Sequence, residues 1–228
     1  MGDLRRLIVF DLDGTLVDSR RDLADAANAL ILERGGRALP EERIGRMVGE
    51  GAAVLVRRAL VAASLPVDED SLLRFLELYD ERLLRTTRPY EGIPAVLQTL
   101  SSRGVVAVLT NKPLGPARRV LDGLGLSAFV ASVVGGDGPF PRKPDPASLH
   151  SLIAMHAGAR ERTVLVGDSR IDFETARAAG TAICLARYGF GFEGFPRAEL
   201  RGDEGLADEP AQIVGEVDRL LDRRAGSY

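Results

Sequence analysis

The chain of 228 residues is long enough for one large domain or two smaller domains with a sizeable core. Its 45% hydrophobic and 28% charged residues are typical of an ordinary soluble globular protein, and a net charge of -3 gives no general attraction to nucleic acid or anionic membranes. The sequence has no apolar run of about 18 residues to span a bilayer and no signal-peptide segment at its start, so we expect a cytoplasmic protein.

The first predicted element is a buried strand at residues 7–10, and Asp11, Asp13 and Gly14 follow it. A short apolar run that ends in an acid and a glycine is typical of a parallel strand covered on both faces. Alternate side chains of a strand share a face, so the two carboxylates lie side by side where the strand ends. With a cation to offset the like charges, one carboxylate can act as nucleophile and the other as acid and base. The alternative is a strand end with two solvated acids.

Residues 20–88 show helical periodicity and almost no strand signal. The first helix starts at Arg20 and closes at the pair Gly35 and Gly36. Three more helices are predicted at residues 40–47, 51–63 and 68–85. Four helices joined by short turns form a small bundle.

From Pro89 onward, helices and strands alternate. Helices are predicted at 93–102, 115–124, 146–157, 169–179 and 212–223, and strands at 105–109, 129–134, 163–166 and 182–185. This alternation predicts an α/β fold with a doubly wound parallel sheet and helices on both faces. Residues 189–208 are expected to form a surface loop. We predict a core domain of residues 1–18 and 89–228, and an inserted helical cap of residues 19–88 that overhangs the carboxyl edge of the sheet.

Further candidate residues follow the later strands. Thr110 and the amide of Asn111 can donate hydrogen bonds to phosphoryl oxygens, although the hydroxyl could instead satisfy the turn. Lys143 lies among three prolines that make its segment rigid. Only Lys112 and Lys143 among the 30 lysine and arginine residues are lysine. Because a site that needs a compact cation resists replacement by arginine, both lysines are candidates.

Asp168 and Asp172 flank the end of the strand at 163–166 and the start of the next helix. Helix capping explains one acid there, but it does not explain an additional acid at the edge where Asp11 already lies. A magnesium ion bound by carboxylates, a backbone carbonyl, water and a substrate phosphate fits this pattern.

In order, the motifs DLDGT, TN, KP and GDSRID resemble the four signatures of the haloacid dehalogenase-like superfamily, in the form found in its phosphatases. The resemblance implies a magnesium-dependent phosphomonoester hydrolase. Asp11 would be the nucleophile that forms an aspartyl-phosphate, and Asp13 the general acid and base whose carbonyl also binds Mg²⁺.

The same resemblance implies roles for the later motifs. Thr110 and Lys143 would hold the phosphoryl group, and Asp168 with Asp172 would complete the metal site. The strings TNKP, GGDGPFPRKPDP and GDSRIDFETARAAG are most similar to phosphoglycolate phosphatases, which implies a small phosphorylated metabolite as substrate.

The turn at residues 48–51 is the candidate specificity loop of the cap. Glu50 and Gly51 precede a helix whose N-terminal amides and positive dipole end can receive an anionic leaving group such as a carboxylate. Arg46 could add a bidentate contact. Alternatively, the glycines only separate two helices.

Three other functions remain open from the sequence. A phosphosugar mutase, or a pyrophosphatase or nucleotidase of the same superfamily, would keep these core residues. A catalytically silent binding protein on this fold would carry a broken motif, and all four motifs are intact. Dehalogenases lack the second acid of the first motif, and phosphonate hydrolases use a cap lysine that this chain does not have.

Overall fold

The computed structural model describes residues 5–156 and 159–225, and its main sheet has six parallel strands in the order β5-β4-β1-β6-β7-β8. The strands are β1 (Leu7–Phe10), β4 (Val105–Leu109), β5 (Ser132–Val134), β6 (Thr163–Gly167), β7 (Ala182–Ala186) and β8 (Gly205–Ala207). β1 is central, with Phe10 in register with Val108 on β4 and Val166 on β6. The predicted parallel sheet is therefore confirmed, and its middle strand carries the first motif.

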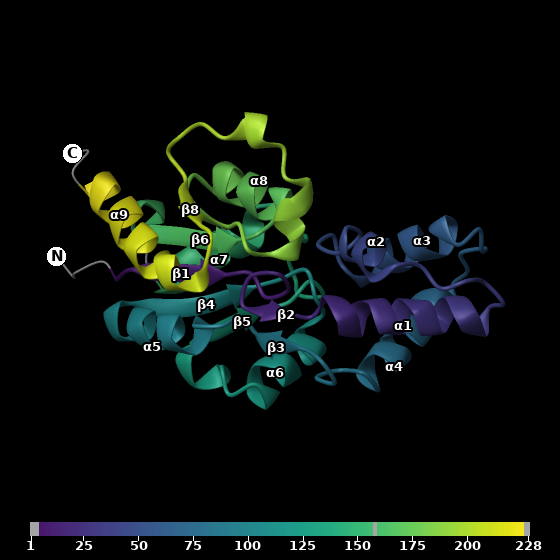
Figure 1. Ribbon diagram of the computed structural model, residues 1–228. Coiled ribbons are helices and arrows are strands. Elements are labelled where there is room, and N and C mark those ends of the chain that lie inside the picture. The colour runs from purple at the N-terminus through teal and green to yellow at the C-terminus, as the bar shows by residue number, and fades with distance from the viewer. Residues whose placement is uncertain (1–4, 157–158, 226–228) are drawn as a thin grey trace.

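Helices cover both faces of this sheet (Figure 1). On one face lie α5 (Ile93–Arg103), α6 (Leu114–Gly123) and α9 (Ile213–Ala225), and on the other lie α7 (Ala147–His156) and α8 (Arg170–Ala179). Alternate residues of β1 serve the two apolar layers: Ile8 and Phe10 pack into one, Leu7 and Val9 into the other. All four are buried, as a strand covered on both faces requires.

The other four helices form a separate bundle at one end of the sheet (Figure 1). They are α1 (Arg20–Glu33), α2 (Glu41–Gly45), α3 (Ala52–Ala62) and α4 (Asp70–Asp80). These helices bury an apolar cluster of their own, which includes Leu30, Leu60 and Phe75. The bundle emerges from the core between β1 and α5, beside the carboxyl ends of the strands.

The two chain segments that join bundle and core are held together. They pair as a short antiparallel ribbon of β2 (Val17–Asp18) and β3 (Arg88–Pro89). Next to it, the buried carboxylate of Asp22 accepts hydrogen bonds from the backbone N–H and hydroxyl groups of Thr86 and Thr87. Burial alone would raise the pKa of Asp22, but these hydrogen bonds lower it below its ordinary value.

Some boundaries differ from the sequence prediction. The fourth helix ends at Asp80, and residues 81–85 form turns in which Leu84 has a φ of +69°. β5 begins only at Ser132, because a 3₁₀ turn occupies Ser127–Phe129. Residues 189–208 were expected to be a plain surface loop, yet they contain β8 and bury three phenylalanines.

Some predicted ends lie outside the described residues, namely residue 157 of the helix predicted at 146–157 and residues 1–4 and 226–228 of the core. Across residues 5–156 and 159–225, no helix combines the length and the apolar character that a bilayer crossing needs.

Candidate active site

The first acid of the site continues the central strand. The backbone N–H of Asp11 donates to the carbonyl of Val166 at 2.9 Å, so its carboxylate lies at the carboxyl edge of the sheet. Gly14 then turns the chain away with a φ of +89°, and a Cβ there would lie 2.0 Å from Oδ2 of Asp168. Only glycine fits this turn, which therefore brings the first and last motifs together.

Three buried carboxylates meet at this edge, those of Asp11, Asp168 and Asp172. One oxygen of each lies within 4.8 Å of the others. The Lys143 Nζ lies between two of them, 2.9 Å from Oδ1 of Asp11 and 2.6 Å from Oδ1 of Asp172. The structure thus gathers four of the residues predicted from the sequence into one charged cluster.

Burial perturbs the protonation of this cluster. Burial raises the pKa of Asp11 to about 7, with Lys143 acting in the opposite direction. Burial also raises the pKa of Asp168 well above its usual range, and the charges of Asp11 and Asp172 add to that effect. Although burial tends to lower the pKa of Lys143, its two acidic neighbours raise it above the ordinary value. One lysine therefore does not compensate three buried acids.

A divalent cation fits this donor set. Hard carboxylate oxygens are the ligands that Mg²⁺ prefers in proteins, and a bound cation would favour their ionised form. Neighbouring groups hold the carboxylates in place: Thr15 Oγ1 donates to Asp168 at 3.2 Å, the Gly191 N–H donates to Asp168 at 2.7 Å, and Ser169 Oγ donates to Asp172 at 2.6 Å. Asp11, Asp168 and Asp172 are the described side chains that could hold such an ion.

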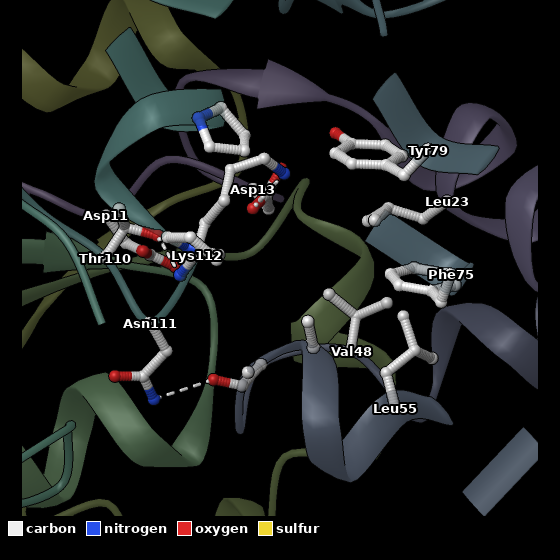
Figure 2. Close-up of a pocket in the computed structure, with 15 residues that line it drawn as sticks. Asp11, Asp13, Leu23, Val48, Leu55, Phe75, Tyr79, Thr110, Asn111 and Lys112 are labelled. Atoms are coloured by element: carbon white, nitrogen blue, oxygen red, sulfur yellow. Dashed lines mark hydrogen bonds and ion pairs between the residues drawn. The ribbon is translucent and has the colours of Figure 1, made fainter. Parts of the chain in front are cut away.

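The side chain of Asp13 lies outside that cluster, in a different environment. Both of its carboxylate oxygens accept from Lys112 Nζ, at 2.7 and 2.8 Å, and one also accepts from Ser19 Oγ at 2.5 Å. Burial favours the neutral form of Lys112, but the Asp13 charge raises the pKa of Lys112 above its ordinary value. The two acids of the first motif are therefore next to different lysines, as Figure 2 shows for Asp13 and Lys112.

The residues after β4 connect the parts of the site. The side-chain amide of Asn111 donates to the carbonyls of Gly49 and Lys143, both at 2.9 Å, and its oxygen accepts from the Lys143 N–H at 2.9 Å. Thr110 lines the pocket beside Asp11, and its Oγ1 accepts from the Lys112 N–H at 3.2 Å. Asn111 thus ties the lysine segment and the bundle loop to the strand end.

A pocket opens between these groups and the helical bundle (Figure 2). Asp11, Asp13, Thr110 and Lys112 line it on the core side. The bundle side is formed by the apolar residues Leu23, Val48, Leu55 and Phe75, together with Tyr79 and the start of α3 at Gly51 and Ala52. About 50 Å³ is open to the centre of a water-sized sphere, which is room for a small molecule.

Two of the predicted bundle contacts lie elsewhere. Gly51 lines the pocket, but Arg46 and Glu50 line a separate hollow with Arg58 and Arg170. Glu50 forms an ion pair with Arg58 there. Gly51 therefore lines the same pocket as Asp11, whereas Arg46 and Glu50 lie outside that pocket.

Two contributors to the site were missed from the sequence, and a third was predicted without its contact. Lys112 was a candidate without a partner, and the scarcity of lysine was the signal for it. Tyr79 comes from α4, and nothing in its sequence context distinguished it from a core residue. The loop after β7 also contributes, because the Tyr188 hydroxyl donates to the carbonyl of Thr15 at 2.8 Å and Gly191 contacts Asp168.

Comparisons with known proteins show which family the chain resembles. A family model described as haloacid dehalogenase-like hydrolase matches residues 5–180. The chain is 42% identical over 197 residues to a phosphoglycolate phosphatase of Rhodospirillum rubrum, covering 82% of each protein. It is 37% identical over 227 residues to a phosphoglycolate phosphatase of Pseudomonas syringae pv. tomato, covering 96% of this chain and 80% of the relative.

A crystal structure described as that of a predicted phosphoglycolate phosphatase from Haemophilus somnus superposes with a TM-score of 0.84. The two sequences are 30% identical, and the match covers 94% of this chain and 99% of the other. The similarity therefore extends over both the sheet and the helical bundle.

Proposed function

The chain belongs to the haloacid dehalogenase-like hydrolase family and is a phosphatase, and from this premise we propose that it is a Mg²⁺-dependent phosphoglycolate phosphatase. The observation that carries the proposal is the separation of Asp11 and Asp13. One carboxylate faces Lys143 and the acidic cluster, whereas the other faces Lys112 and Ser19. Two acids in such different surroundings suit two different roles.

In the proposed reaction, an oxygen of Asp11 attacks phosphorus and forms an aspartyl-phosphate while the bond from phosphorus to the leaving oxygen breaks. Asp13 takes part in its protonated form: it gives its proton to that oxygen and so releases glycolate. As a carboxylate, Asp13 then accepts a proton from a water molecule that attacks the same phosphorus, and the bond from the Asp11 oxygen to phosphorus breaks. Inorganic phosphate leaves, and both carboxylates return to their initial states.

The remaining core residues bind and orient the phosphoryl group. Lys143 contacts Asp11 and places a compact positive charge beside the nucleophile, and the Thr110 hydroxyl and the backbone N–H of Asn111 offer donors from the end of β4. Asp11, Asp168 and Asp172, with the backbone carbonyl of Asp13, would hold the magnesium ion. When bound, that ion supplies positive charge that offsets the phosphoryl oxygens.

Size and similarity support phosphoglycolate as the substrate. The pocket has room for a small leaving group. The relatives at 42% and 37% identity are named phosphoglycolate phosphatases. At Gly51 and Ala52, the positive end of α3 faces the pocket and could receive the glycolate carboxylate.

We also propose that residues 19–88 act as a cap domain over a core formed by residues 1–18 and 89–228. The bundle has its own apolar cluster and forms the apolar wall of the pocket. In this role it excludes water from the site during the first step and contacts the leaving group.

A phosphate-release assay tests the function. The purified chain is given phosphoglycolate, pyrophosphate, a nucleoside monophosphate and glucose 1-phosphate, with Mg²⁺ or with a chelator. We expect kcat/KM to be highest for phosphoglycolate and turnover to stop with the chelator. Conversion of glucose 1-phosphate to its isomer would support the mutase instead, and no phosphate release from any substrate would support the silent binding protein.

A further inference from the structure

Tyr79 has a buried hydroxyl group that makes no hydrogen bond of ordinary length within the described residues. The residue lies on α4 and is 3% exposed, and the polar group that interacts with its hydroxyl is the ammonium of Lys112, which already holds both oxygens of Asp13. A buried hydroxyl without a partner costs free energy, so native proteins rarely keep one without a reason.

Packing does not explain this hydroxyl. The ring of Tyr79 stacks parallel to that of Phe75, with ring centroids 6.0 Å apart and an interplanar angle of 3°. A phenylalanine would make the same ring contact and bury no polar atom. The oxygen is therefore an addition that the core of the bundle does not need.

The position of the hydroxyl suggests what it binds. Tyr79 lines the pocket, and Figure 2 shows its oxygen directed toward Asp13 and Lys112. The Lys112 ammonium lies 4.8 Å from the centre of the Tyr79 ring and is the one cation on the pocket wall within the described residues. The neighbouring bundle residues Leu23, Leu55 and Phe75 are apolar, so they offer a substrate no hydrogen bond through their side chains.

A hydroxyl beside an ammonium suits an anionic group. Burial raises the pKa of Tyr79, so the hydroxyl keeps its proton and remains a donor. Hydrogen bonds to a charged acceptor are stronger than those between neutral groups, above all where water is excluded. A carboxylate at this place would therefore give the hydroxyl an acceptor.

We propose that Tyr79 is a specificity-determining residue whose hydroxyl donates a hydrogen bond to the carboxylate of the leaving group, beside Lys112. The proposal rests on the proposed phosphatase function and assigns part of substrate selection to α4. It gives the apolar wall of the pocket one polar contact, placed next to the acid that protonates the leaving oxygen.

The test compares two substrates of equal length in Tyr79→Phe. Phosphoglycolate carries the carboxylate, and ethyl phosphate has a methyl group in its place. We expect the ratio of kcat/KM for phosphoglycolate to that for ethyl phosphate to fall by about tenfold to a hundredfold. Tyr90→Phe is the matched control, since Tyr90 lies outside the pocket wall, and it should leave the ratio as in the wild type.

Thermal unfolding separates this role from a structural one. Because the hydroxyl makes no hydrogen bond of ordinary length, Tyr79→Phe should keep or raise the Tm while the substrate ratio falls. A lower Tm with equal losses on both substrates, or an unchanged ratio, would overturn the inference in an active enzyme. Failure of the wild type to release phosphate from either substrate would instead overturn the proposed function, and this inference with it.

Discussion

The core side of the pocket is lined by charged residues, whereas the bundle side is lined mainly by apolar residues. The core side concentrates charge: buried Asp11 and Lys112 and half-buried Asp13 line the pocket, and buried Lys143, Asp168 and Asp172 lie in the cluster around Asp11. The bundle side presents Leu23, Val48, Leu55 and Phe75, with one hydroxyl from Tyr79. The described part of the bundle brings no charged side chain to the pocket wall.

This difference separates chemistry from selection. Buried charges act strongly only where water is excluded, so the charged side depends on the apolar side to cover it. The apolar side performs no chemistry and can vary with the leaving group. Changes on the core side should therefore lower the rate for every substrate, whereas changes on the bundle side should alter the preference among substrates.

Among variants that keep the nucleophile Asp11, the largest expected effect on the core side is that of Asp13→Asn. The amide cannot give or take the proton, so kcat should fall by about 10² to 10⁴ for phosphoglycolate and for ethyl phosphate alike. Asp18→Asn makes the same change in β2, at a residue that does not line the pocket, and serves as the control. Unchanged kcat in Asp13→Asn would remove this acid from catalysis.

The next largest loss of kcat is expected when the lysines are replaced by arginine. Lys143 contacts two acids in a crowded cluster, where a guanidinium cannot replace a compact ammonium, so Lys143→Arg should lower kcat by about 10². Lys112 contacts both oxygens of a single carboxylate, a geometry that arginine can reproduce. Steady-state kinetics should therefore find a smaller loss in Lys112→Arg. The opposite order would contradict the assigned contacts.

Without the metal, the buried acids on the core side should make the free energy of unfolding depend on pH. The pKa of Asp11 in the fold is about 7, above its unfolded value of 3.8, so its contribution is greatest below pH 3.8 and is lost as the pH rises from there to about 7. Without metal, the free energy of unfolding should fall by on the order of 4 kcal/mol across that range. Chemical denaturation with and without Mg²⁺ measures this, and equal profiles would argue against a cation at the cluster.

The smallest predicted effect concerns the bundle loop. Gly51 has a φ of +93°, and a Cβ there would lie 3.3 Å from the carbonyl oxygen of Asn111, so Gly51→Ala should shift the start of α3. We expect the KM for phosphoglycolate to rise about tenfold and that for ethyl phosphate to rise less. Arg46→Ala changes a residue outside the pocket and should leave both values unchanged. Equal effects of the two variants would place recognition in the other hollow.

The contrast also explains what could be predicted from the sequence. Asp11 and Asp168 follow buried strands directly, and the carboxyl ends of parallel strands meet at one edge, so their proximity follows from topology alone. Lys143 could be predicted because the segment that carries it is made rigid by prolines. On this side of the pocket, neighbours in space are set by local motifs.

The bundle side depends on how four helices pack, and local patterns do not set this. Arg46 and Gly51 are five positions apart, yet they line different hollows, because the turn between α2 and α3 directs them apart. Tyr79 belongs to an apolar stripe of α4, and only the packed bundle reveals that its hydroxyl faces Lys112. Its hydroxyl could not be distinguished from that of any other buried tyrosine.

The central claim is that Asp11 forms a covalent bond with phosphorus. The most direct measurement mixes the enzyme with phosphoglycolate that carries a radiolabelled phosphate, quenches with acid within one turnover, and maps the label by peptide mass spectrometry. We predict label on Asp11 in the wild type and none in Asp11→Asn. A wild-type enzyme that turns over phosphoglycolate but carries no label on Asp11, or an Asp11→Asn variant with comparable turnover, would contradict the account.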